Sequence, residues 1–152
     1  MRPMPPTLSR QMYENDTLGD CVCAAVEHAD GVFTGNAQST AGGLVYTNAN
    51  TTALYSAACG YVPGDPSTDN GCDVQTVLAY WQNKGLFGSG NKITVMVDVN
   101  PSSLTEMQTA VYLFENFILG LDLPYAWITP FPSVSGFTWA WRGRPIRVTA
   151  IV

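Results

Sequence analysis

Apolar positions recur at helical spacing in two stretches of the chain. Between residues 73 and 84 they fall three or four positions apart, and Gly85 follows as a stop signal. A second stripe runs from residue 104 to residue 114, after Ser103 and Glu106 at the spacing of a capping box. We therefore predict two amphipathic helices, whose inner faces carry Val74, Val77, Leu78 and Trp81, and Leu104, Met107, Val111 and Phe114.

Small apolar residues dominate the stretch 21–33, which predicts a helix buried in the middle of the fold. Asp20 stands at the N-cap position, and Gly31 and Gly35 are typical of a helix end. A shorter helix is predicted for 51–59. The polar stretch 36–43 and the turn sequence 65–71 are predicted to be loops.

Three stretches have the pattern of β-strands. Alternation over 92–99 predicts a half-buried strand, and the apolar run 117–123 predicts a second strand that ends at Pro124. After Gly143 the chain alternates again up to Val152, which predicts a third strand. Residues 1–12 hold three prolines and no periodicity, so we expect an extended arm there.

Helices therefore come first and strands later, which favours an α+β fold in one domain over residues 1–152. A chain of 152 residues can bury about two thirds of its unfolded surface. Apolar residues make up 46% of the chain and charged residues 12%, a balance typical of a globular protein.

The net charge of the chain limits which kinds of molecule it is expected to bind. The net charge of −5 and the pI near 4.5 disfavour nucleic acid or an anionic membrane as a partner, although Arg142, Arg144 and Arg147 cluster near the end. No apolar run approaches the roughly 20 residues that span a bilayer, and the first residues lack the apolar core of a signal peptide. We expect a soluble protein.

Cys21 is the candidate nucleophile. It follows a Gly19-Asp20 turn and opens the predicted helix 21–33, where free N–H groups and the helix dipole favour a thiolate. Asn15, six residues earlier, offers an amide donor for an oxyanion. The alternative is that Cys21 and Cys23 are small buried hydrophobes, as free cysteines usually are.

The remaining candidates point to structure. His28, the only histidine, lies about 10 Å along the helix from Cys21, so we expect it to be a hydrogen-bonded scaffold residue. Cys59 and Cys72 bracket the loop 61–71 and can form a disulfide if the loop brings them together. No zinc spacing or phosphate loop is present, so no metal or cofactor is expected.

Several short motifs resemble papain-like or C39-like cysteine peptidase-fold proteins of bacteria and phages. The motifs span about residues 12–125, and they are Asn15-Asp16, Gly19-Asp20-Cys21, Ala24-Ala25, His28 and the run 61–71. The resemblance implies a helical half facing a partial antiparallel β half-barrel, incomplete at the C-terminus. It also implies Cys21 as nucleophile, Asn15 as oxyanion donor, and a location in the cytoplasm or a phage particle.

The general base is where the chain departs from that family. A papain-like site takes the thiol proton with a downstream histidine, and Arg144 stands at that position here. An arginine stays protonated and cannot act as a base. A degenerate site, a truncated or frame-shifted sequence, and a wall supplied by another chain all remain open.

Two functions follow. The first is a cysteine peptidase or amidase type of domain with little or no activity. The second is a non-catalytic binding or structural protein, such as a virion component, that reuses the scaffold. For either, we expect a peptide or protein partner in the cleft or at a C-terminal edge strand, and an oligomer or larger assembly.

Overall fold

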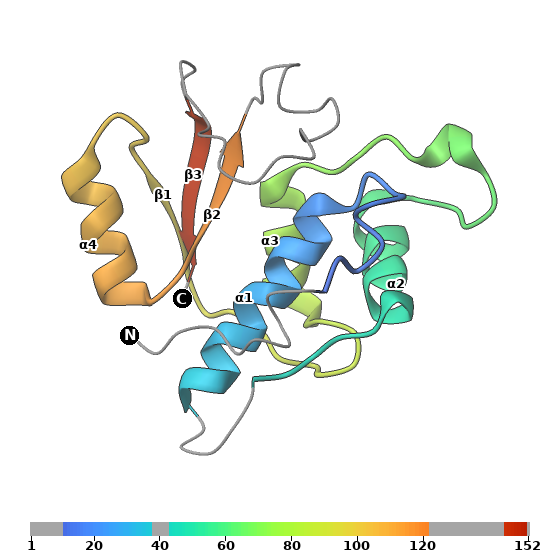
Figure 1. The fold of residues 1–152 in the computed structure, drawn as a ribbon, viewed down its shortest axis with the longest axis horizontal. Helices are drawn as coiled ribbons and strands as arrows, with labels where there is room; N and C mark the ends of the chain where they lie inside the picture. The colour runs from blue at the N-terminus through green and yellow to red at the C-terminus, as the bar shows by residue number, and fades with distance from the viewer. Residues whose placement is uncertain (1–10, 38–42, 122–144, 152) are drawn as a thin grey trace, which may run out of the picture.

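A computed structural model describes residues 11–37, 43–121 and 145–151. The predicted arm, apart from residues 11 and 12, and the predicted base position Arg144 lie outside these residues. Helix α1 runs through the middle of the molecule, with α2 and α3 on one side and the sheet on the other (Figure 1). The fold is of the α+β class, as the sequence predicts. The elements are α1 (Cys21–Ala37), α2 (Asn48–Cys59), the 3-10 turn η2 (Pro66–Thr68), α3 (Val74–Lys84), β1 (Met96–Val99), α4 (Leu104–Phe114), β2 (Phe117–Leu121) and β3 (Pro145–Ile151).

Helix α1 is longer than predicted, because Gly31 and Gly35 lie inside it and do not end it. The close packing at this point requires a glycine at position 43. A Cβ added to Gly43 would lie 1.7 Å from the carbonyl oxygen of Gly31 and 3.0 Å from the backbone nitrogen of Gly35. The chain that returns toward α2 therefore crosses α1 at a distance that only glycines allow.

Side-chain caps set the start of α2 and α3. Thr47 and Asn50 form a reciprocal capping box, so α2 begins three residues before the predicted start at residue 51. Asp73 accepts hydrogen bonds from the backbone N–H groups of Gln75 (2.9 Å) and Thr76 (3.3 Å). Helix α3 then ends at Gly85, as predicted.

Helix α4 has the predicted N-cap but only half of the predicted box. The Ser103 hydroxyl accepts from the Glu106 N–H at 3.2 Å, whereas the Glu106 carboxylate accepts from the N–H of Asn100 at 3.0 Å. Glu106 thus fixes the turn before the helix. Of the predicted inner face, Leu104 is 64% exposed, and the buried residue of this helix is Ala110.

The first strand is shorter than its alternating pattern predicts. Side chains of α3 engage the backbone between residues 91 and 94, because the Trp81 indole donates to the Asn91 carbonyl (3.1 Å) and the Gln82 amide donates to the Thr94 carbonyl (2.9 Å). Strand β1 begins at Met96, which pairs with Ile151, the last described residue of β3.

Among the described residues the sheet has the order β1-β3-β2, with both pairings antiparallel. The expectation of an exposed C-terminal edge strand is therefore wrong. Strand β3 lies in the centre because β1 and β2 pair with its two sides, and the edges belong to β1 and β2 (Figure 1). Helix α4 packs on the sheet, and α1 packs against β2.

The main core lies where α1, α2 and α3 meet. Its largest fully buried side chains include Trp81, Tyr13, Tyr55, Leu54 and Leu78. A smaller cluster joins Val99 of β1 to Ala110 of α4. The helical core fixes the start of α1, where the candidate nucleophile lies.

Candidate active site

Cys21 is the first residue of α1, and its side chain is exposed. Cys23 lies two positions further on, is fully buried, and has a thiol pKa raised by burial. The two thiols therefore lie in different surroundings. The buried-hydrophobe alternative holds for Cys23 and fails for Cys21.

The loop before the helix is tightly coiled around Glu14. The backbone N–H groups of Thr17 and Leu18 both donate to the Glu14 carbonyl at 2.8 Å. Tyr13 and Glu14 have φ angles of 53° and 69°, in the left-handed region that L residues rarely adopt. Such strain persists only where the surroundings hold it, and buried Tyr13 is the anchor.

Asn15 is exposed at the top of this coil, and its backbone N–H donates to the Met12 carbonyl at 3.0 Å. Its side-chain amide makes no hydrogen bond to another described residue. The amide is therefore available to an incoming group.

Asp20 occupies the N-cap position but does not cap the helix through its side chain. Its carbonyl accepts from the Ala24 N–H at 3.0 Å, while both carboxylate oxygens are buried without a hydrogen-bond partner among the described residues. Burial, with a smaller contribution from the nearby charges of Glu14, Asp69 and Asp16, raises the pKa of Asp20 to about 6. The first turn of α1 thus starts beside a group of acids.

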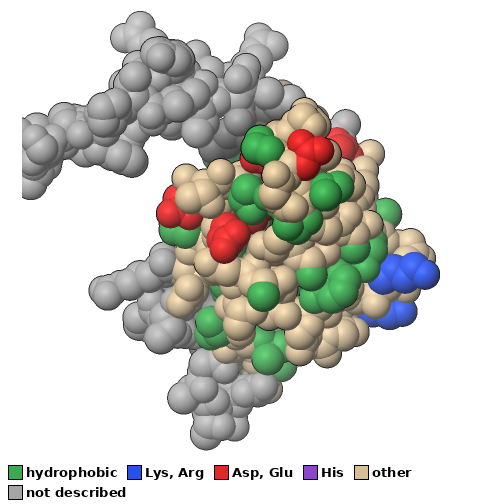
Figure 2. Space-filling model, turned by 90° about the vertical axis from the view of Figure 1, so that its right-hand side faces the viewer, with side chains coloured by type: hydrophobic (Ala, Val, Ile, Leu, Met, Phe, Trp, Pro, Cys, Tyr) green, Lys and Arg blue, Asp and Glu red, His purple; other side chains and the backbone are tan. Residues whose placement is uncertain are grey.

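The positive end of the α1 dipole also lies at this first turn. The lysines of the described chain, Lys84 and Lys92, are both exposed. Figure 2 shows basic side chains at one margin of the face that it draws, away from the acidic side chains.

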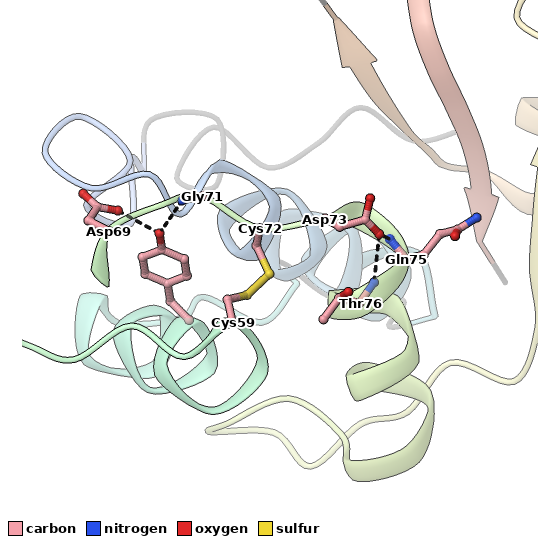
Figure 3. Close-up of a disulfide and its surroundings, with 8 residues drawn as sticks. Cys59, Asp69, Gly71, Cys72, Asp73, Gln75 and Thr76 are labelled. Carbon is pink, nitrogen blue, oxygen red and sulfur yellow. Dashed lines mark hydrogen bonds between the residues drawn. A yellow bond between two sulfur atoms is a disulfide. The ribbon is translucent and has the colours of Figure 1, made fainter. Parts of the chain in front are cut away.

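The loop 65–71 is bonded to the turn before Cys21. One Asp69 carboxylate oxygen accepts from the Gly19 N–H at 2.9 Å and from the Tyr55 hydroxyl at 2.7 Å. The same hydroxyl accepts from the Gly71 N–H at 2.9 Å, and Figure 3 shows Asp69 and Gly71 on either side of it. Burial raises the pKa of Tyr55 to about 12, so the phenol keeps the proton that it donates.

The motif Gly19-Asp20-Cys21 and the loop 61–71 are thus in direct contact, although no pattern in the sequence predicts it. A Cβ on Gly19 would lie 2.9 Å from the Asp69 oxygen, so glycine allows the approach. Tyr55 was not predicted to take part. Its only sequence signal is a tyrosine in a small-residue helix just before the loop.

Cys59 and Cys72 form a disulfide, with 5.6 Å between their Cα atoms. This confirms that the loop brings them together. The bond joins the end of α2 to the residue just before the Asp73 cap of α3 (Figure 3). The loop 61–71 is therefore closed at its base by the disulfide and held close to its C-terminal end by Asp69.

His28 is a scaffold residue, as predicted. Its Nε2 lies 3.0 Å from the Gln11 carbonyl oxygen, and its ring centre lies 4.7 Å from that of Tyr13. Burial lowers the pKa of His28, which favours the neutral ring. The histidine ties the segment before the coil to the middle of α1.

In the described part of the chain, no group of three or more His, Cys, Asp or Glu side chains is placed to hold a metal ion. Asp65 instead accepts from the N–H (3.0 Å) and the hydroxyl (2.6 Å) of Ser67, and these bonds lower its pKa. Its carboxylate organises the turn that leads to Asp69.

Comparison of the chain with protein-family models, with curated proteins and with solved structures finds no match. Within the described residues, no helix has the length and apolar character needed to cross a membrane.

Proposed function

We propose that this chain is a cysteine peptidase or amidase type of domain with a papain-like architecture, in which Cys21 is the nucleophile. The observation that carries the proposal is the contrast between an exposed Cys21 at the first position of α1 and a sealed Cys23 two residues later. A nucleophilic thiol needs access and a field that favours the anion.

In this proposal, the Cys21 sulfur attacks the carbonyl carbon of an amide or ester, and the carbonyl oxygen becomes an oxyanion. Asn15 donates its free side-chain amide to that oxygen, and the first-turn N–H groups of α1 add their dipoles. The one histidine, His28, lies seven residues further along α1 and contacts the Gln11 carbonyl, so it is not placed to take the thiol proton or to return it to a leaving amine. Activated esters should therefore acylate Cys21, whereas ordinary amides should not turn over.

The test is the rate of alkylation by iodoacetamide across pH 4 to 9, followed by mass spectrometry of each cysteine. Cys23 is the internal control, and Cys21→Ala is the matched variant. A Cys21 reaction that persists well below pH 7 supports the nucleophile. A rate that rises only near the pKa of a free thiol, about 8.5, argues for the second function below.

The second candidate is a non-catalytic binding or structural protein, for example a component of a phage particle. The observation that favours it is helix α4, where Leu104, Tyr112 and Leu113 are 64%, 84% and 59% exposed. A helix that is apolar on most sides usually packs against something. One side of it forms a groove of about 590 Å³, lined by Leu104, Met107, Gln108, Val111, Tyr112, Glu115 and Phe117.

Sedimentation of the wild type and of Tyr112→Glu tests this candidate separately from the thiol chemistry. Assembly that Tyr112→Glu abolishes supports a structural role. A wild type that sediments as a monomer at all concentrations removes self-assembly from the candidate functions, whatever the reactivity of Cys21.

A further inference from the structure

The loop 65–71 ends in Asn70 and Gly71, a pair of residues that can react with each other. In an Asn-Gly pair, the glycine main-chain nitrogen can attack the Cγ carbon of the asparagine, since glycine has no side chain to obstruct the approach. The new N–C bond closes a cyclic imide, and the side-chain nitrogen leaves as ammonia with the proton of the attacking N–H. Water then opens the imide at either carbonyl, which gives aspartate or isoaspartate. Asparagine is thermolabile for this reason.

The fold requires the glycine of this pair. Gly71 has a φ angle of 75°, in the left-handed region that other residues rarely adopt. The loop also passes close to the turn before α1, because a Cβ added to Gly19 would lie 3.3 Å from the Gly71 nitrogen and 3.4 Å from its Cα. Asn70 is exposed to water. Backbone geometry therefore places a labile pair at the protein surface.

Tyr55 holds the attacking nitrogen of this pair. The Gly71 N–H donates to the Tyr55 hydroxyl at 2.9 Å, and the hydroxyl gives its own proton to Asp69 at 2.7 Å (Figure 3). Tyr55 is fully buried, so α2 fixes the position of its hydroxyl. While this bond holds, the Gly71 peptide plane cannot turn toward the Asn70 side chain, and the proton that must leave the nitrogen is shielded from water.

The other reacting group, the Asn70 side-chain amide, is held more weakly. Its Nδ2 donates to the Ser67 carbonyl at 3.0 Å, and this bond is exposed. An exposed bond within a loop opens more readily than a bond to a buried side chain. The Tyr55 hydroxyl is therefore the stronger of the two restraints on the reaction.

We propose that Asn70-Gly71 is a latent site of spontaneous imide formation and deamidation, and that the Tyr55 hydroxyl protects it in the native protein. The site becomes reactive when the loop separates from α2. Isoaspartate then adds a main-chain carbon between Asp69 and Gly71, so that the Tyr55 hydroxyl can no longer meet both. The reaction uses only Asn70, Gly71 and water, and it is independent of the chemistry proposed for Cys21.

The test is to incubate the full chain at neutral pH, in buffer and in guanidinium chloride, and to follow each asparagine by peptide mass spectrometry with fragmentation that distinguishes isoaspartate. In denaturant, Asn70 should react fastest, because it alone precedes a glycine. In the native chain it should react at least about tenfold more slowly, since reaction then waits for local opening. A faster asparagine in denaturant, or equal native and denatured rates at Asn70, overturns the proposal.

Tyr55→Phe removes the acceptor and keeps the ring. Native Asn70 should then deamidate about fivefold faster, the factor that corresponds to one neutral hydrogen bond. Val77→Ala is the matched control, because it leaves a cavity in the same core without touching a hydrogen bond of the loop. Equal acceleration in the two variants overturns the role of Tyr55, since general opening of the core then sets the rate.

Two measurements on the wild type do not depend on the folding of either variant. The Gly71 amide should be protected from hydrogen exchange, and exchange at the rate of an unstructured peptide overturns the proposal. The isoaspartate fraction, separated by its additional negative charge, should unfold at a lower denaturant concentration than the unmodified chain. An unchanged unfolding midpoint means that Tyr55 does not depend on this pair, which also overturns the proposal.

Discussion

The carboxylate of Asp69 accepts a hydrogen bond from the backbone N–H of Gly19, fifty positions earlier in the chain. The residue after Gly19 is buried, and the next is the candidate nucleophile. Position and orientation of the first turn of α1 thus depend on a loop that lies beyond the second helix.

Removing this acceptor should loosen the turn before Cys21. In Asp69→Ala, the Gly19 N–H and the Tyr55 hydroxyl both lose their partner, and each unsatisfied buried donor costs about 1–3 kcal/mol. Both bonds are only partly buried, so we expect the free energy of unfolding in urea to fall by about 1–3 kcal/mol for the two together, and the alkylation rate of Cys21 to change with it.

Tyr55→Phe is the matched control for Asp69→Ala. It removes the phenol bonds to Asp69 and Gly71 but leaves the bond from Gly19 in place. Stability should fall while the Cys21 rate stays near that of the wild type. If both variants change the Cys21 rate equally, the Gly19 bond has no separate role in positioning the turn.

The disulfide should stabilise the helical half. Cys59 and Cys72 are 13 positions apart, and closing a loop of about 15 residues is worth about 3 kcal/mol in the chain-entropy account. The paired variant Cys59→Ser, Cys72→Ser should lose about that much in urea unfolding. Reduction of the wild type should reproduce the loss, whereas a reductant should leave the variant unchanged.

Local patterns predicted most of the helical half. The stripe that ends in Trp81 and the Gly85 stop are both set within one helix, and each is confirmed. A disulfide between Cys59 and Cys72 could also be predicted, because the two cysteines lie at the ends of one loop and a loop brings its ends together. The exposure of Cys21 beside a buried Cys23 follows from two positions on one helix.

What the sequence did not reveal depends on distant partners. Gly31 and Gly35 look like helix ends but lie inside α1, and the close crossing at Gly43 has no local sequence signal. The central place of β3 depends on pairing with two strands at once. The bond between Gly19 and Asp69 joins two loops, where no periodic signal exists.

Buried acids on α1 should make the protein most stable in acid. Burial raises the pKa of Glu27 from 4.5 to about 8, and one of its oxygens has no partner among the described residues. Between these pH values the unfolded chain has lost the proton and the folded chain keeps it. The contribution is therefore complete below about pH 4.5 and is lost as the pH rises toward about 8.

Urea unfolding at a series of pH values measures this effect. The wild type should lose up to about 1.4 kcal/mol per pH unit for each such group, with Asp20 adding to the slope up to its pKa of about 6. Glu27→Gln should flatten the upper part of the curve, because an amide cannot ionise. Glu115→Gln, at an exposed carboxylate, should leave it unchanged, and a wild type that gains stability over this range contradicts the prediction.

The two free thiols should react at different rates, Cys21 in the native protein and Cys23 only when the core opens. Cys21 is exposed, whereas Cys23 is sealed in the core with its thiol pKa raised by burial. A thiol reagent in excess over the native protein should therefore modify one thiol rapidly. The second should react at the rate at which the helical core opens, because the thiolate of Cys23 forms only in contact with water.

Cys21→Ala should remove the fast phase and leave the slow phase unchanged, while Cys23→Ala should do the reverse. Adding urea below the unfolding midpoint should accelerate the slow phase and leave the fast phase alone, since only Cys23 waits for opening. A Cys23 that reacts as fast as Cys21 in the native state would contradict the burial on which the contrast between the two thiols depends.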